Sequence, residues 1–381
     1  PPAQLRLHLA PQARIQAVTG KGEALPHVRE GALLVLDLGA LPEAPHEVKL
    51  VYSVRFDDAP PRRPLNTDNP GLGVRGTISP QGTVLLAGSG WYPRVMGVGR
   101  TIHLSVAAPE GILAVTSGRL EGHVTRTADA ESQGSRPPVK ETVSTWHITR
   151  PTGAVSLCAG AYVQQRRRSG PHLALTYLSP ANGHLADRYL EASLNYLADY
   201  SDRFGPYPFD HFAVVENFYP TGYGFPGFTL MGGRVLRLPF IIPTSLRHEI
   251  AHCWWGNGVG VDPSGGNWCE GLATYVADYA HRAEQGEAKA AAYRRELLRN
   301  YTSLVNPAEA LPLTRFQSRR DRITKAVGYD KAALVFHMLH RQLGAGFWAA
   351  LEDLYRERLF QRVSWRGLRT YFERHAEGSL E

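Results

Sequence analysis

Two histidines four residues apart, in His248-Glu249-Ile250-Ala251-His252, constrain the fold of this chain more than any other feature. On a helix, residues i and i+4 lie on one face, so His248 and His252 would stand side by side and could bind one Zn²⁺ through their ring nitrogens. Glu249 would project next to them, where it can take a proton from a zinc-bound water. The alternative is an ordinary helix that carries two histidines, because the pattern alone is only moderately specific.

Length and composition predict more than one folded domain. The chain has 381 residues, which is more than one ordinary hydrophobic core accommodates, so we expect two domains. A hydrophobic fraction of 43% and a charged fraction of 20% are typical of a soluble globular protein. The apolar runs are short and are interrupted by glycine, proline or charged residues, so we expect no membrane-spanning segment.

Residues 1–170 show the pattern of an antiparallel β-sandwich-like domain. Short stretches of aliphatic and β-branched residues alternate with glycine and proline turns, and no helical period lasts more than two turns. Strands are predicted at 31–38, 46–56, 101–107, 111–116, 141–149 and 154–163, with surface loops at 57–70 and 127–139.

Residues 171–381 predict a mainly helical domain that contains the histidine pair. An apolar stripe of helical period begins at Leu185 and stops before Gly205, and Pro243-Thr244-Ser245 offers a cap for the helix with the histidines. Further helices are predicted at 270–284, 287–304, 329–343, 346–359 and 364–376, and strands at 212–216 and 228–231. The predicted fold class is therefore α+β, an all-β domain followed by a mainly helical one that carries the chemistry.

A catalytic zinc with two histidines needs a third protein ligand and an open position for water. Glu270 opens a predicted helix 18 positions after His252, and glycines and a proline supply a chain reversal between them. Two antiparallel helices joined in this way can bring Glu270 to the metal. The alternative is a carboxylate that the helix dipole favours at a helix N-terminus. We interpret Cys253 and Cys269, which flank the motif, as packing residues.

The stretch H-E-I-A-H-C-W-W-G-N, followed by E-G-L-A-T-Y, resembles the gluzincin aminopeptidase family, which includes membrane alanyl aminopeptidases and leukotriene hydrolase. That family reads H-E-x-x-H-x-W-[FW]-G-N and then W-L-N-E-G-F-A. Here 17 residues separate His252 from Glu270, one fewer than in the family, and the linking loop easily absorbs this loss. The resemblance implies a thermolysin-like zinc catalytic domain in which His248, His252 and Glu270 bind one Zn²⁺ per chain.

A second stretch, Gly328-Tyr329-Asp330-Lys331-Ala332-Ala333-Leu334-Val335, resembles the family's Y-E-K-G-A-x-V-L. The resemblance implies that Tyr329 donates a hydrogen bond to the oxyanion formed on attack. From the sequence alone, a tyrosine here is more often only an aromatic residue at the start of a helix. Larger family members continue into a C-terminal helical domain, so we expect a minimal two-domain form or a truncated chain.

The chain departs from the family where the substrate's amino group is bound. Family aminopeptidases carry G-x-M-E-N before the zinc motif, and the glutamate of this stretch binds the free α-ammonium. Here Gly222-Tyr223-Gly224-Phe225 stands instead, with Gly224 at the position of the glutamate. Tyr223 and Phe225 would offer an aromatic wall. Glu216, eight residues before Gly224, is the candidate replacement if the loop folds back.

We therefore expect a zinc metallopeptidase that hydrolyses peptide bonds, an aminopeptidase with an altered motif for reading the N-terminus. One alternative is an oligopeptidase or endopeptidase that needs no free N-terminus. An alternative of another class is a non-catalytic, zinc-stabilised module that binds peptides. An epoxide hydrolase has precedent in the family, but no residue of this chain argues for it.

Charge and cysteine content limit the binding partners and disulfides that we expect. The net charge of +7 comes partly from short arginine clusters, and without a basic face interleaved with aromatics we expect no nucleic-acid binding. Three cysteines without paired spacing form no disulfide framework. The chain starts at Pro1 without methionine, so a removed export signal and an internal cut fit equally. The compartment, cytoplasmic or exported, and the oligomeric state stay open, and the expected partner is a peptide substrate.

Overall fold

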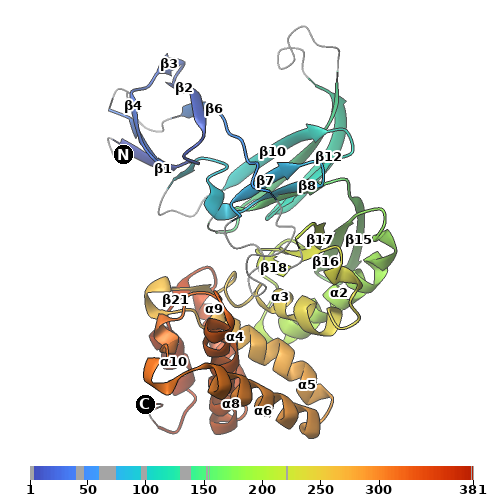
Figure 1. Cartoon of the computed structure of the whole chain (residues 1–381), viewed down its shortest axis with the longest axis vertical. Coiled ribbons are helices and arrows are strands. Elements are labelled where there is room, and N and C mark those ends of the chain that lie inside the picture. Colours follow the sequence, from blue (N-terminus) through green and yellow to red (C-terminus); the bar gives the residue numbers. More distant parts are fainter. Residues whose placement is uncertain are drawn as a thin grey trace. The chain divides into compact units, whose positions relative to one another are not determined.

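The structure is a computed structural model that describes residues 4–39, 47–59, 74–95, 101–128, 139–151, 153, 155–219, 222–378 and 380. The chain divides into two compact units, one within residues 1–160 and one that consists chiefly of Ala161–Glu381 (Figure 1). Antiparallel sheets build the first unit, and the second is mainly helical, which confirms the predicted α+β class. Most of the two predicted loops, 57–70 and 127–139, lies outside the described residues.

Residues 4–160 contain four antiparallel sheets, with the strand orders β4-β5-β1-β9, β3-β2-β6, β10-β13-β12 and β11-β14-β8-β7. Their strands are β1 (Gln4–His8), β2 (Arg14–Gly20), β3 (Glu23–Ala24), β4 (His27–Glu30), β5 (Leu33–Asp37), β6 (Val48–Ser53), β7 (Gly76–Ser79), β8 (Gly82–Leu85), β9 (Arg94–Val95), β10 (Ile102–Pro109), β11 (Leu113–Thr116), β12 (Arg119–Thr127), β13 (Lys140–Ile148) and β14 (Leu157–Gly160).

The sheet β10-β13-β12 has one face toward the core of its unit and one toward solvent. Along β10, half-buried Leu104 and Val106 pack against a hydrophobic cluster, whereas His103 and Ser105, which alternate with them, are exposed. On β13 the fully buried Trp146 belongs to the inner face. This alternation is what a two-residue period gives an antiparallel strand that is buried on one side only.

The second unit begins with a five-stranded sheet of order β15-β16-β17-β19-β18. Its strands are β15 (Val163–Ser169), β16 (His172–Leu178), β17 (Phe212–Asn217), β18 (Gly222–Phe225) and β19 (Phe228–Gly232). The pairs β16–β17 and β17–β19 are parallel, and helix α2 (Ala186–Phe204) provides the crossover between β16 and β17. Strand β18 forms one edge of the sheet and contacts helix α3 (Arg247–Ala251).

Helices make up the rest of the second unit. They are α4 (Cys269–Ala273), α5 (Ala280–Glu284), α6 (Glu287–Leu304), α7 (Arg322–Lys325), α8 (Ala332–Leu343), α9 (Gly346–Arg358) and α10 (Trp365–Glu373), with the π-helical segments η4 (Ile242–Leu246), η6 (Thr274–Tyr279) and η9 (Ala326–Lys331). Short 3₁₀ turns lie at Ala87–Ser89, Gly183–Leu185, Val235–Arg237, Pro263–Gly265, Pro307–Glu309 and Leu313–Arg315, and β20 (Gly260–Val261) pairs with β21 (Arg362–Val363).

Two helix starts differ from the prediction. Helical backbone begins at Ile242, ahead of the expected cap, and the Thr244 hydroxyl donates to the carbonyl of Phe240 instead of capping a helix. The helix expected to start at Tyr329 begins at Arg322, because Asp321 and Thr324 form a reciprocal capping box there. Among the described residues, no helix combines the length and the apolar character needed to cross a membrane.

Candidate active site

Three side chains from two helical segments converge in the second unit. His248 lies on α3, His252 directly follows it, and Glu270 lies in the first turn of α4. The Nε2 atoms of His248 and His252 are 3.2 Å apart. Oε2 of Glu270 lies 3.6 Å from Nε2 of His248 and 3.3 Å from Nε2 of His252. The predicted one-residue-shorter linker therefore still brings Glu270 to both histidines.

This arrangement fits a zinc ion. Ligand atoms that bind one tetrahedral Zn²⁺ at about 2.0–2.1 Å lie roughly 3.3 Å from one another. The three separations between His248, His252 and Glu270 fall around that value, and two imidazoles with one carboxylate are a common catalytic donor set. These residues would hold the metal and leave a further position for water.

The outer nitrogen of each histidine is also bound. Nδ1 of His248 lies 2.8 Å from Oδ2 of Asp278, and Nδ1 of His252 lies 3.0 Å from the carbonyl oxygen of Trp255. Such contacts fix the ring orientation and leave Nε2 to face the metal. Asp278 was not predicted from the sequence, although it lies eight residues after Glu270 on one helical segment, close to two turns and thus on the same side.

Buried acidic side chains make the site favourable for positive charge. Burial alone would lower the pKa of His248, but Asp278 and Glu270 outweigh this effect and raise that pKa to about 9. Burial raises the pKa of Glu249, with neighbouring Glu270 and Asp278 adding to the effect. A divalent cation held by the histidines and Glu270 would balance the negative charge of these carboxylates.

Each π-helical segment contributes to the site or adjoins it. Segment η4 leads directly into α3, η6 contains Asp278, and η9 contains Tyr329. A π-helical turn widens the backbone and shifts side chains relative to a regular α-helix, and such turns are frequent at functional sites. In this chain all three π-helical segments contribute residues that line one cavity.

His248, His252 and Glu270 open onto a cavity of about 660 Å³. Glu249 and Tyr329, the predicted catalytic residues, both line it. Burial raises the pKa of Tyr329 well above its usual value, and the nearby Glu270 carboxylate acts in the same direction. The phenol therefore keeps its proton and can donate a hydrogen bond. Further lining residues that the sequence analysis missed are Ser245, Asn257, Thr274, Asp278, Tyr293, Ser318, Arg319, Lys325 and Asp330.

The predicted substrate-binding residues lie in different surroundings. Gly222, Tyr223 and Gly224 on edge strand β18 line the cavity. Phe225 instead stacks on the ring of Phe228, with 4.7 Å between the ring centroids. Of the two cysteines interpreted as packing residues, Cys253 is fully buried, whereas Cys269 reaches the cavity wall.

Glu216 does not line the cavity. Its carboxylate accepts hydrogen bonds from the backbone N–H and hydroxyl of Ser179, at 2.8 and 3.0 Å, and from the Asn182 amide at 2.8 Å. The carboxylate thus ties the loop after β16 to the end of β17.

The fold defined by these elements is that of the M1 zinc metallopeptidases of known structure. A structure of the M1 zinc metallopeptidase from Deinococcus radiodurans is 22% identical and has a TM-score of 0.70, covering 98% of this chain and 83% of that chain. A mutant of the enzyme from this organism, bound to a Tyr-Ser-Ala substrate, is 20% identical with a TM-score of 0.69 and covers 99% of this chain and 84% of that chain.

A third structure is described as a two-domain M1 zinc metallopeptidase mutant bound to L-tryptophan. It is 21% identical with a TM-score of 0.68, and the match covers 98% of this chain and 83% of that chain. The sequence matches no protein-family profile and no curated protein. At these identities the likeness concerns the fold, and the chemistry of this chain must be argued from its own residues.

Proposed function

We propose that this chain is a zinc-dependent metallopeptidase. The observation that carries the proposal is the convergence of His248, His252 and Glu270, within 3.2–3.6 Å of one another, in a cavity that also contains Glu249 and Tyr329. A zinc ion bound there supplies Lewis acidity, which polarises a carbonyl group and lowers the pKa of a water molecule. The mutant M1 enzyme solved with Tyr-Ser-Ala supports a peptide as the substrate.

Residues of the chain itself carry out proton transfer and stabilise the oxyanion. Glu249 accepts a proton from the attacking water and passes it to the leaving amine, as a general base and then a general acid. Glu249 lines the same cavity as His248, His252 and Glu270, so its carboxylate is placed to take up this proton and to return it. Tyr329 keeps its proton and donates a hydrogen bond to the developing oxyanion.

The acids around the cavity favour a peptidase that does not require a free N-terminus on its substrate. Glu216 is engaged with Ser179 and Asn182, so it supplies no ammonium ligand. Four acids line the described part of the cavity. Glu249 and Glu270 are assigned to proton transfer and metal binding, Asp278 binds His248, and Asp330 binds Lys325 at 3.1 Å. Beside Gly224 a substrate ammonium would meet only the carboxylate of Glu249, which proton transfer requires, so no acid is reserved for the ammonium. Blocking the N-terminus of a peptide should therefore change its rate of hydrolysis little.

The test compares the zinc-loaded chain on an unblocked tripeptide and on its N-acetylated form, with Glu249→Gln as the control. We expect hydrolysis that depends on Glu249, with similar kcat/KM for both substrates. A strong preference for the unblocked peptide would support the aminopeptidase version instead. Equal zinc content and no difference in hydrolysis between wild type and Glu249→Gln would point to the non-catalytic peptide-binding module and would overturn the proposal.

A further inference from the structure

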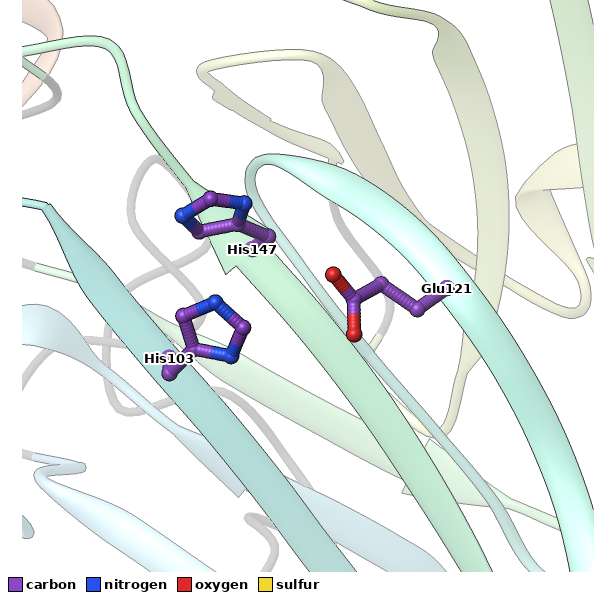
Figure 2. A group of neighbouring side chains, drawn as sticks. All are labelled: His103, Glu121 and His147. Carbon is purple, nitrogen blue, oxygen red and sulfur yellow. The ribbon is translucent and has the colours of Figure 1, made fainter.

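A second group of two histidines and one glutamate lies on the solvent-facing side of the sheet β10-β13-β12. The group comprises His103 on β10, His147 on β13 and Glu121 on β12, and we refer to it as the outer cluster (Figure 2). One ligand atom of each residue lies within 4.8 Å of those of the other two. Among the described residues it is one of two groups with this property, and the other is the set His248, His252 and Glu270.

The two histidines are fixed relative to each other by strand register. His103 and His147 are direct partners in the antiparallel pair β10–β13. Their ring centroids lie 4.1 Å apart with an interplanar angle of 38°. Directly opposite residues have Cβ atoms about 4.5–5.5 Å apart, so two imidazoles placed there can turn their nitrogens toward one point with only side-chain rotation. Figure 2 shows the two rings beside each other above adjacent strands.

Glu121 on β12 completes the group. One of its carboxylate oxygens lies within 4.8 Å of a ring nitrogen of each histidine, and its side chain is exposed. Figure 2 shows this carboxylate pointing from its strand toward the two rings.

A cation already lies near Glu121. The guanidinium of Arg119 is 3.5 Å from Oε1 of Glu121, in a pair whose side chains are 59% and 34% exposed. So exposed a pair contributes little to stability and is readily exchanged, because solvent screens it. Arg119 is therefore a weak competitor for the carboxylate, and its removal offers a sharp test of whether a metal ion binds there.

We propose that the outer cluster is a second binding site for a divalent transition-metal ion, for which zinc is the probe. Two imidazoles and one carboxylate are the ligands that Zn²⁺ and its first-row neighbours prefer, whereas Mg²⁺ and Ca²⁺ require mainly oxygen ligands. Since His103 and Glu121 are exposed, the ion exchanges with solvent and completes its coordination with water. A bound ion would link three strands of one sheet and stabilise its folded state by mass action.

The first measurement counts zinc ions per full-length chain after equilibrium dialysis. We expect two in the wild type, one in His103→Gln, and one in a His248→Ala/His252→Ala double variant. Adding His103→Gln to that double variant should remove the remaining zinc ion. Peptidase activity of His103→Gln, measured with the cavity loaded, stays at the wild-type level. The outer site does not depend on the proposed function, because the count in the double variant is independent of hydrolysis.

The second measurement compares zinc affinities by calorimetric titration in the His248→Ala/His252→Ala background. His147→Gln should weaken binding at least about tenfold, since even the loss of an outer-shell partner costs 10–100-fold. Arg119→Gln should tighten binding, because a competing cation is removed. The exposed His184 lies outside the cluster, so His184→Gln is the matched control and should change nothing. A single zinc in the wild type, or equal zinc content with and without His103→Gln, overturns the proposal.

Discussion

A Cβ atom built on Gly224 would lie 2.5 Å from Oε2 of Glu249, well inside van der Waals contact. A Cβ on Gly222, two residues earlier on β18, would lie 3.6 Å from Oε1 of the same carboxylate, which is an ordinary contact. The glycine at 224 therefore leaves the space that the Glu249 carboxylate occupies.

Substitution of Gly224 should thus disturb catalysis more than folding. The clashing atom is the end of a flexible side chain, so in Gly224→Ala the Glu249 carboxylate can move away without a rearrangement of the backbone. We expect kcat to fall at least about tenfold, because a displacement of a catalytic group by only about 1 Å can greatly lower the rate. The thermal midpoint should change little.

Gly222→Ala is the matched control for this effect, because its added methyl group keeps a normal distance from Glu249. It should retain most of the wild-type kcat. If both alanine variants lose kcat equally, then the effect comes from the edge strand in general and not from contact with Glu249.

Loss of the Asp278 carboxylate should weaken metal binding. Asp278 holds Nδ1 of His248 at 2.8 Å, and removal of such an outer-shell partner typically lowers metal affinity 10–100-fold. Asp278→Asn should show this loss in competition with a chelator, with kcat largely recovered at saturating zinc. Asp187→Asn, which removes an exposed carboxylate paired with Arg167, should keep the wild-type affinity. An unchanged affinity in Asp278→Asn would contradict this role.

Removal of the Tyr329 hydroxyl should lower kcat with little change in KM. A hydrogen bond made mainly to the oxyanion stabilises the transition state more than the bound substrate, and the loss of one such donor costs about 10²–10³ in kcat. Tyr329→Phe should show this loss with an unchanged zinc content. Tyr293 lines the same cavity, and Tyr293→Phe should retain most activity. A rise in KM without loss of kcat would show instead that Tyr329 binds the substrate in the ground state.

The convergence of His248, His252 and Glu270 could be predicted from sequence because its signals are local. His248 and His252 are related by one helical turn, and Glu270 opens the next long helical segment. Asp278 carries the same kind of signal at helical spacing from Glu270. The clash at Gly224, in contrast, depends on the contact between the edge strand β18 and α3, which no short sequence pattern encodes.

The surroundings of Glu216 and the outer cluster could not be predicted, because both depend on strand pairing between distant residues. Glu216 meets Asn182, 34 residues earlier, only because β17 pairs in parallel with β16 after a helical crossover. His103 meets His147 only through the register of β10 and β13. Register is set by hydrophobic pattern and turn geometry over whole strands, so an isolated histidine gives no signal of it.

The stability of the fold should decrease below neutral pH through a buried histidine. His211, which precedes β17, is only 3% exposed, and burial lowers its pKa to about 4. The unfolded chain binds this proton below about pH 6.5, whereas the folded chain binds it only near pH 4. Between these values the unfolded state holds more protons, so the free energy of unfolding falls as the pH drops, by about 3 kcal/mol in total for this group.

Urea unfolding of wild type, His211→Gln and His184→Gln at pH 7 and pH 4.5 tests this effect. Carboxylates also titrate in this range, but they do so in all three proteins, so the comparison isolates the histidine. The loss of unfolding free energy between the two pH values should be smaller in His211→Gln than in wild type. His184 is exposed, and its replacement should leave the pH dependence as in wild type. The same pH dependence in all three proteins would show that His211 is protonated equally in the folded and unfolded chains.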